Sequence, residues 1–196
     1  MTAVTIATVV EGHGEVEAVP LLLRRIVADM APGLYLNVPR PHRIGRHALV
    51  RPGGLENVVK TQGDRVASVG GVLILIDADD DCPAELAPQL LRRALAARSD
   101  RRIALVLANR EYEAWFLAAA QSLAGQRGFP DMLEPPGRPE GIRGAKEWLS
   151  GKRRGRPYKE TADQAALTQR FDMKAARTHS PSFDKLWRDV ERLISE

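Results

Sequence analysis

The chain of 196 residues contains one cysteine, Cys82, and no apolar run near the roughly 20 residues of a membrane-spanning helix. A single cysteine excludes a disulfide within the chain and a cysteine-rich zinc site. The apolar residues 3–10 lack the basic flank and the small-residue cleavage site of an export signal, so we expect a buried strand there. These absences predict a cytoplasmic protein without a membrane segment.

A strong charge imbalance is also lacking. The 29 Lys and Arg residues against 25 Asp and Glu give a net charge of +4, which is too small to identify a polyanionic partner unless the basic residues cluster. Hydrophobic residues make up 44% of the chain, enough for the core of one domain with a modest appendage. Extensive disorder is therefore not expected.

Several common metal- and phosphate-binding motifs are missing. The chain has no Gly-x4-Gly-Lys-Ser/Thr loop and no His-Glu-x-x-His, and the segment 12–14 lacks the third glycine of a dinucleotide fingerprint. The run 77–81 starts like an EF-hand loop, but Cys82 and Pro88 stand where that loop requires Gly and Glu. The acidic residues must therefore be interpreted by their own positions.

Short apolar segments alternate with segments of helical spacing over the first 124 residues. Strands are expected at 3–10, 72–76 and 103–107, with a weaker one at 34–38, and helices at 15–30, from Leu55 through Val66, at 85–97 and at 111–124. Continuous Val, Ile and Leu runs are typical of parallel strands buried on both faces. The alternation predicts an α/β domain whose mostly parallel central sheet is flanked by helices.

The pattern changes after residue 124. Residues 125–144 are rich in Gly and Pro, as a linker would be. Thr161 with Gln164 has the spacing of a capping box, and Ser182 precedes an amphipathic final helix that carries Phe183, Leu186, Trp187, Val190, Leu193 and Ile194. We expect one domain over 1–124, and over 125–196 a linker and a helical C-terminal extension packed on it.

Acidic residues follow three of the expected strands. They are Glu11 and Glu15 after the first, Asp77, Asp79 and Asp81 after 72–76, and Glu111 and Glu113 after 103–107. The carboxyl ends of parallel strands meet at one edge of a sheet, where ligands bind. Crowded carboxylates repel one another unless a cation lies among them, and oxygen ligands suit Mg²⁺ or Mn²⁺. Each motif alone is typical of a turn or a helix start, but together they predict a divalent metal site.

The segments 9–15 (VVEGHGE) and 73–81 (LILIDADDD) resemble the topoisomerase–primase (Toprim) domain, whose signature is a Glu after strand one and an Asp-x-Asp after strand three. The Glu-Gly-x-x-Glu form is most similar to the nuclease branch, which contains the overcoming-lysogenization-defect (OLD) proteins and ribonuclease M5. Residues 109–116 (NREYEAWF) are similar to a bacterial Toprim-like group, domain-of-unknown-function family 4276. The resemblance covers about the first 125 residues and implies a Toprim-like fold.

The resemblance also implies roles for the acids. Glu11 would ligate metal and act as general acid or base, while Asp77 and Asp79 would hold Mg²⁺. Further acids complete a second metal site in the nuclease branch, and those available here are Glu15, Asp81, Glu111 and Glu113, of which we favour Glu113. The implied activity is that of a nuclease with two Mg²⁺ or Mn²⁺ ions, in a bacterial defence or DNA-processing system. A separately encoded ATPase is an expected partner, and a homodimer stays open.

Two basic segments could hold DNA or RNA beside the acids. One carries Arg43, Arg46 and Arg51, and the other carries Lys152, Arg153, Arg154, Arg156 and Lys159. Contacts of such residues with phosphates give a salt-dependent affinity that is largely independent of base sequence. Exposed Lys and Arg are equally typical of solvated loops. Tyr158 either stacks on a base or packs against the tail, whereas Trp115 and Phe116 have the spacing of core residues.

Two other functions are consistent with the same residues. The chain could be a noncatalytic subunit whose acidic site binds metal or an ATPase partner. It could also be a metal-dependent phosphohydrolase that acts on small phosphate esters. Metal-dependent cleavage of a nucleic acid that is lost when Glu11 or Asp77 is replaced would distinguish the nuclease from both.

Overall fold

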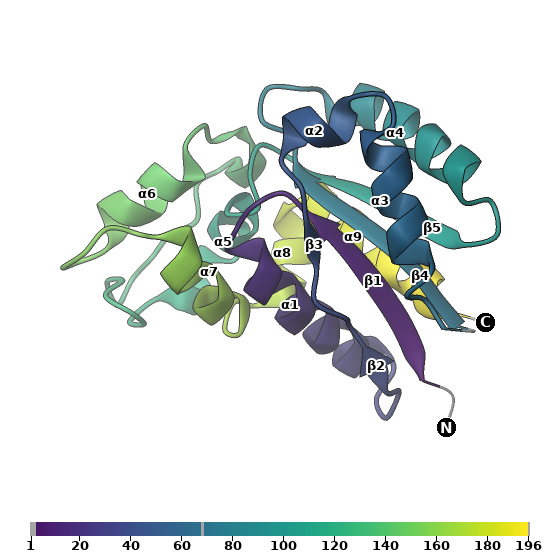
Figure 1. Ribbon diagram of the computed structural model, residues 1–196. Helices are drawn as coiled ribbons and strands as arrows, with labels where there is room; N and C mark the ends of the chain where they lie inside the picture. The colour runs from purple at the N-terminus through teal and green to yellow at the C-terminus, as the bar shows by residue number, and fades with distance from the viewer. Residues whose placement is uncertain (1–2, 68, 196) are drawn as a thin grey trace.

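The structure is a computed structural model that describes residues 3–67 and 69–195, and its centre is a parallel sheet (Figure 1). The order along the sheet is β2-β1-β4-β5, and β3 pairs with the far end of β1. The strands are β1 (Val4–Val10), β2 (Leu36–Asn37), β3 (His42–Arg43), β4 (Val69–Asp77) and β5 (Arg102–Ala108). Each of these pairings is parallel, which confirms the predicted fold class.

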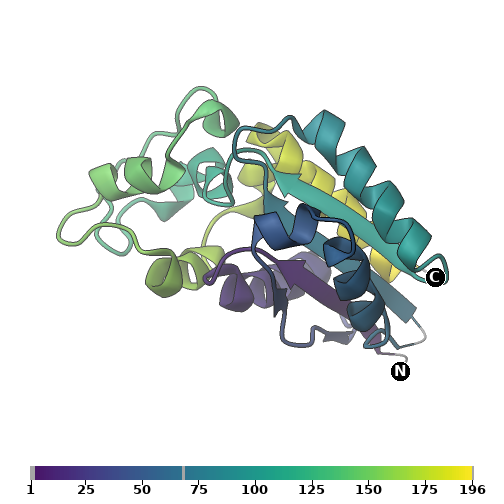
Figure 2. The same cartoon turned by 45° about the horizontal axis from the view of Figure 1, so that its top comes forward.

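Helices cover both faces of the sheet (Figure 2). Helices α1 (Glu15–Met30) and α9 (Pro181–Ile194) lie on one face, and α3 (Gly54–Gly63) and α4 (Pro83–Ala97) on the other. Alternate side chains of β1, β4 and β5 enter the two cores, as the twofold repeat of a strand requires. On β4, Leu73 and Leu75 pack toward α1 and α9, while Val72, Ile74 and Ile76 pack toward α3 and α4. This double burial explains the uninterrupted apolar strand sequences.

A helical lobe extends beside the carboxyl end of the sheet (Figure 1). We call it the C-terminal lobe; it comprises α5 (Ala114–Ala118), η1 (Ala120–Leu123), η2 (Pro139–Gly141), α6 (Ala145–Lys152), α7 (Glu160–Thr168) and α8 (Met173–His179). After the lobe, α9 returns to the sheet and packs on β4 and β5. The predicted C-terminal helix is thus confirmed, and it covers one face of the sheet. Among residues 3–67 and 69–195, none of the helices combines the length and the apolar character of a membrane span.

Three local predictions were wrong in extent or position. The expected helix at 111–124 is split into α5 and η1, because the backbone of Ala119 (φ −115°, ψ 24°) leaves the helical region. The strand expected at 34–38 shrinks to β2, whose extension is ended by Pro39, a residue without an amide donor. The short helix α2 (Arg46–Val50) and β3 lie between the strand expected at 34–38 and the helix expected from Leu55, where no helix or strand was predicted.

The caps of the last helices also differ from the prediction. Helix α7 begins at Glu160, one residue before the expected cap Thr161, and the amide of Lys159 donates to Asp163 Oδ2 at 2.9 Å. Helix α9 is capped by Ser180, whose Oγ accepts from the amide of Phe183, and Pro181 follows in the first turn. Proline fits there because the first-turn amides lack helical partners.

Candidate functional site

The turn after β1 is built around the carboxylate of Glu15. The amides of Glu11 and Gly12 donate to Glu15 Oε2 at 2.9 and 3.0 Å. A Cβ atom on Gly14 would collide with the Gln164 side chain and would lie 2.8 Å from the carbonyl oxygen of Glu160. Glycine at position 14 therefore lets α7 approach the start of α1, which brings the C-terminal lobe against this turn.

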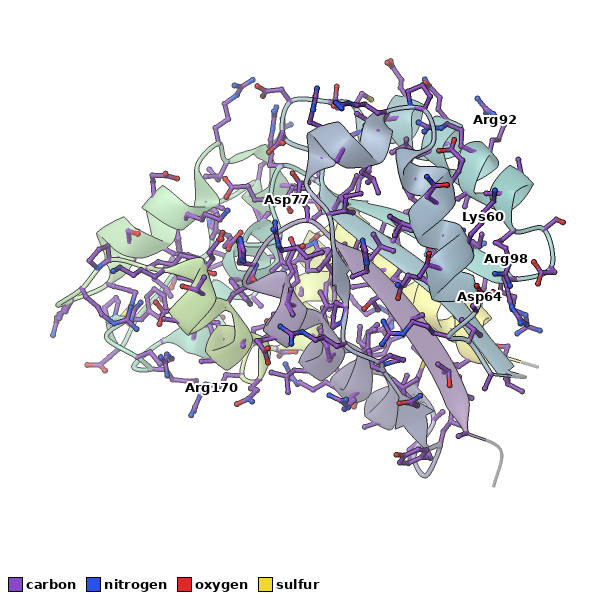
Figure 3. All side chains as sticks on the ribbon, viewed as in Figure 1. Lys60, Asp64, Asp77, Arg92, Arg98 and Arg170 are labelled. Atoms are coloured by element: carbon purple, nitrogen blue, oxygen red, sulfur yellow. The ribbon has the colours of Figure 1, made fainter. Side chains whose placement is uncertain are left out.

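Asp77 ends β4 and is tied to the segment that follows β5. Its Oδ1 accepts from the amide of Tyr112 at 2.8 Å, and the next amide, of Ala78, donates to the carbonyl of Ala108 at 2.9 Å. In Figure 3, Asp77 lies at the carboxyl end of the strands, where the sheet meets the C-terminal lobe. This is the sheet edge at which the sequence predicts a ligand site.

Glu113 approaches the same edge from the segment after β5. Its side chain is completely buried, and Oε1 accepts from the hydroxyl of Tyr158 at 2.8 Å and from Nε2 of Gln164 at 3.3 Å. Glu111 is partly exposed, and its Oε1 accepts from the amide of Ala145 at 3.1 Å. The lobe therefore fixes both acids, and Glu113 is the one turned into the interior.

We call Glu11, Glu15, Asp77 and Glu113 the acid cluster. Burial raises the pKa of Glu15 and of Glu113 to about 7 each, and it raises the pKa of Asp77 well above its usual value. The charges of Glu15 and Glu113 raise the pKa of Asp77 further. Burial, and next the charge of Asp79, raise the pKa of Glu11. These mutual effects mean that carboxylates from three strand ends share one poorly solvated region.

One lysine of the lobe reaches this region. Lys146 Nζ lies 3.2 Å from Glu160 Oε2, 3.6 Å from Glu111 Oε2 and 3.9 Å from Glu113 Oε2. Burial alone would lower the pKa of this ammonium, but the charges of Glu113, Asp77 and the other two acids raise it. Neither Lys146 nor Tyr158 was predicted to contact the acids, because each approaches only through the packing of the lobe.

Two oxygens of the acid cluster have unused acceptor capacity. Glu11 Oε2 and Glu113 Oε2 are buried and have no hydrogen-bond partner among the described residues, and neither has the neighbouring Gln164 Oε1. Such acceptors are costly to bury unless something binds them. In residues 3–67 and 69–195, no three acidic, histidine or cysteine side chains are placed so that they could together hold a metal ion. Hydrogen bonds to Glu15 and Asp77 hold those carboxylates toward backbone amides.

Side chains of the acidic run after β4 form ion pairs with arginines. Asp81, a predicted metal ligand, pairs with Arg46, a predicted nucleic-acid contact, and Arg46 Nη1 also donates to the carbonyl of Asp77 at 2.6 Å. Asp79 is exposed and has a left-handed backbone (φ 50°). Asp80 pairs with Arg110 and Arg143. Of the predicted ligands in this run, Asp77 therefore lies in the acid cluster, Asp79 at its margin, and Asp81 outside it.

Only some side chains of the second basic segment are exposed and available to a partner. Arg153 and Arg156 bind the completely buried Asp163 at 2.8 and 2.7 Å, and Arg127 joins them at 3.2 Å. Burial alone would raise the pKa of Asp163, but hydrogen bonds from these arginines, Arg156 first, lower it to about 2. The Arg153 side chain is 6% exposed, so the structure gives it a structural role in place of the expected contact with nucleic acid.

The other predicted basic contacts are exposed. They are Arg43, Arg51, Lys152, Arg154 and Lys159, and Lys152 lies 5.5 Å from the ring of Trp148. Tyr158 is buried and packs in the lobe, which decides between its two interpretations. Trp115 and Phe116 are completely buried, which confirms them as core residues.

The fold and the acid cluster define an α/β protein with carboxylates gathered at the carboxyl edge of a parallel sheet. A family model described as domain of unknown function (DUF4276) matches residues 10–191, and since this is most of the chain, the chain belongs to that family. The match covers β2, β3, β4 and β5 and the whole C-terminal lobe, and it begins at the last residue of β1. No curated protein and no solved structure matches the chain. The relation to Toprim domains, OLD nucleases and ribonuclease M5 stays a prediction.

Proposed function

We propose that the chain is a Mg²⁺- or Mn²⁺-dependent nuclease that hydrolyses phosphodiester bonds of DNA or RNA. The observation that carries this proposal is the acid cluster itself. Carboxylates from three strand ends share a buried region, and burial raises the pKa of each. Such crowding is unfavourable without a cation, and the ligand set consists of the hard oxygens that Mg²⁺ and Mn²⁺ prefer.

The oxygen donors present are of the type that suits such ions. Glu11 Oε2 and Glu113 Oε2, which accept no hydrogen bond from the described residues, are acceptors that a cation would satisfy. We assign the ions to Glu11, Asp77 and Asp79, with Glu15 and Glu113 available to complete a second site. Asp81 and Glu111, also expected from the sequence, are already bound by Arg46 and by the amide of Ala145, respectively. Bound divalent ions would activate water and neutralise charge on the phosphate.

The residues around the acid cluster have different roles in the proposed site. Tyr158 and Gln164 hold Glu113 through Oε1, which leaves Oε2 for a ligand. Lys146 supplies a permanent positive charge next to Glu113. The raised pKa of Glu11 brings its proton exchange nearer to neutral pH, as a general acid or base requires.

A cleavage assay tests the proposal. Plasmid DNA, single-stranded DNA and RNA are incubated with the full chain in Mg²⁺ or Mn²⁺. We expect cleavage that chelation stops, that Asp77→Asn abolishes and that Glu11→Gln slows by about a hundredfold. Glu85→Gln, on the exposed side of α4, is the matched control and should cleave normally.

Failure of the proposal would take a clear form. If all three polymers stay intact with either ion, with and without a candidate ATPase, the chain is not a nuclease. Hydrolysis of a small phosphodiester alone would favour a phosphohydrolase instead. A defence role and an ATPase partner rest on the family resemblance and stay predictions.

A further inference from the structure

A small pocket opens beside the acid cluster, at the margin where Asp79 lies. It has a volume of about 180 Å³ and is lined by Asp79, Asp80, Arg110, Glu111, Arg143 and Gly144. Two guanidinium groups meet there on one oxygen, because Arg110 Nη1 and Arg143 Nη2 lie 2.7 and 2.8 Å from Asp80 Oδ1. The sequence patterns assigned no role to Asp80 or to either arginine.

The wall of this pocket is held in an unusual backbone conformation. Asp79 and Arg110 both have positive φ angles, 50° and 68°, which non-glycine residues rarely adopt. They are joined by two hydrogen bonds: the amide of Asp79 donates to the carbonyl of Arg110 at 3.0 Å, and Arg110 Nη1 donates to the carbonyl of Asp79 at 2.9 Å. Backbone strain of this kind gathers at ligand sites. The hydrogen bond to the carbonyl of Asp79 also holds the Arg110 guanidinium in place independently of Asp80.

The Asp80 carboxylate is easily displaced from the two arginines. The side chains of Asp80 and Arg143 are 72% and 71% exposed, and ion pairs this exposed contribute little net stability. One carboxylate between two guanidinium groups also leaves one positive charge unmatched. Of the other acids on the wall, Glu111 is balanced by Lys146 at 3.6 Å, and Asp79 is a proposed metal ligand.

A phosphate monoester matches this arrangement better than the carboxylate does. It carries close to two negative charges at neutral pH and three acceptor oxygens. Two guanidinium groups supply two positive charges and planar donor pairs suited to phosphate. A phosphodiester within a strand carries a single charge, so it matches the two arginines less well than a strand end does.

We propose that Arg110 and Arg143 form a subsite for the terminal phosphate of a nucleic-acid strand, which takes the place of the Asp80 carboxylate. That the phosphate belongs to a nucleic acid rests on the proposed function. The preference for a monoester over a hydroxyl end rests on the pocket alone. The subsite would position a strand end next to the acid cluster.

Binding of labelled strands tests this subsite. Short single-stranded DNA and RNA that carry a 5′-phosphate, a 3′-phosphate or only hydroxyl ends are titrated with the full chain by fluorescence anisotropy, with Ca²⁺ in place of Mg²⁺. We expect one phosphorylated end to bind about tenfold more tightly than the hydroxyl end. Arg143→Ala should remove this preference, whereas Arg92→Ala, an exposed arginine on α4 (Figure 3), should keep it.

The Asp80→Asn variant distinguishes displacement of the Asp80 carboxylate by phosphate from a structural role of Asp80. Since the carboxylate competes with the phosphate, its removal should tighten binding of the phosphorylated strand. Weaker binding would mean that Asp80 holds the two arginines in place. It would contradict the proposal that phosphate displaces the Asp80 carboxylate.

The subsite is overturned if the unchanged chain binds phosphate and hydroxyl ends equally, or if Arg143→Ala keeps the preference. Either result alongside normal cleavage would leave the proposed nuclease standing. A preference for the phosphorylated end without cleavage of any polymer would support the subsite and contradict the proposed nuclease.

Discussion

The hydroxyl of Tyr158 donates a 2.8 Å hydrogen bond to Glu113 Oε1, so the loop between α6 and α7 holds the acid that follows β5. Both side chains are buried, and the second oxygen of Glu113 is left without a hydrogen-bond partner among the described residues. The C-terminal lobe therefore does more than pack on the sheet, because it fixes one member of the acid cluster.

Replacement of Tyr158 by Phe should remove one of the two hydrogen bonds by which the lobe holds Glu113. The carboxylate would keep only the bond from Gln164 on Oε1, so we expect a loss of about 1–2 kcal/mol in the free energy of unfolding. Urea denaturation measures it, with Tyr35→Phe as control because Tyr35 is 64% exposed. Equal stability of the two variants would show that the Tyr158 hydroxyl contributes nothing.

Gly14→Ala should separate α7 from the start of α1. The added methyl group meets the side chain of Gln164 and the carbonyl of Glu160, so a loss of about 1–3 kcal/mol is expected. Gly151→Ala is the matched control: this helical glycine has open space around it, and the change should stabilise α6 by about 0.5–1 kcal/mol. Thermal unfolding of both variants measures the difference, and a neutral Gly14→Ala would refute the close approach.

Asp163→Asn should destabilise the lobe. Removal of this buried charge leaves Arg153, Arg156 and Arg127 facing one another, at a cost of about 3 kcal/mol. Asp64→Asn, at an exposed carboxylate that pairs with Arg98, is the control and should destabilise the chain much less. Because the pKa of Asp163 falls from 3.8 to about 2 on folding, its contribution should be present above 3.8 and lost as the pH falls through about 2.

Denaturant titrations at neutral and acidic pH measure these effects. Loss of nucleic-acid affinity in Asp163→Asn at unchanged stability would contradict the structural role given to Arg153.

The affinity for Mn²⁺ should depend on pH through the acid cluster. Metal binding requires ionised carboxylates, and burial raises the pKa of Glu15 and Glu113 from 4.5 to about 7. Protons therefore compete with the ion below about pH 7, so the affinity should rise as the pH rises toward 7 and then level off. Without metal the sign is opposite: the folded state binds more protons than the unfolded state, so stability falls as the pH rises from 4.5 through about 7.

Calorimetric titrations with Mn²⁺ over this pH range measure the first effect, and urea unfolding in chelator measures the second. An affinity that already levels off near pH 5 would mean that Glu15 and Glu113 do not ligate the ion.

The sheet and its covering helices could be predicted because their signals are local. Apolar runs identified β1, β4 and β5, and the apolar spacing of residues 183–194 identified α9. Glu11 and Asp77 could be placed at one edge because parallel strands end together. The split of the helix expected at 111–124 could not be predicted, since Ala119 has no local breaker beside it.

The residues that contact the acids could not be predicted from the sequence, for a different reason. Lys146 and Tyr158 reach Glu113 only because the lobe folds back onto the sheet. In the same way, the sequence does not indicate that Arg153 turns inward to Asp163. A charged residue has the same local signal whether it faces solvent or a buried partner, so long-range packing decides its role.

The central claim is that the acid cluster binds divalent cations, and the most direct measurement is an isothermal calorimetric titration of the full chain with Mn²⁺. The account predicts binding by the unchanged chain and by Glu85→Gln, with affinity at least about tenfold weaker in Asp77→Asn and in Glu113→Gln. No binding by the unchanged chain, or equal binding by all four proteins, would contradict it.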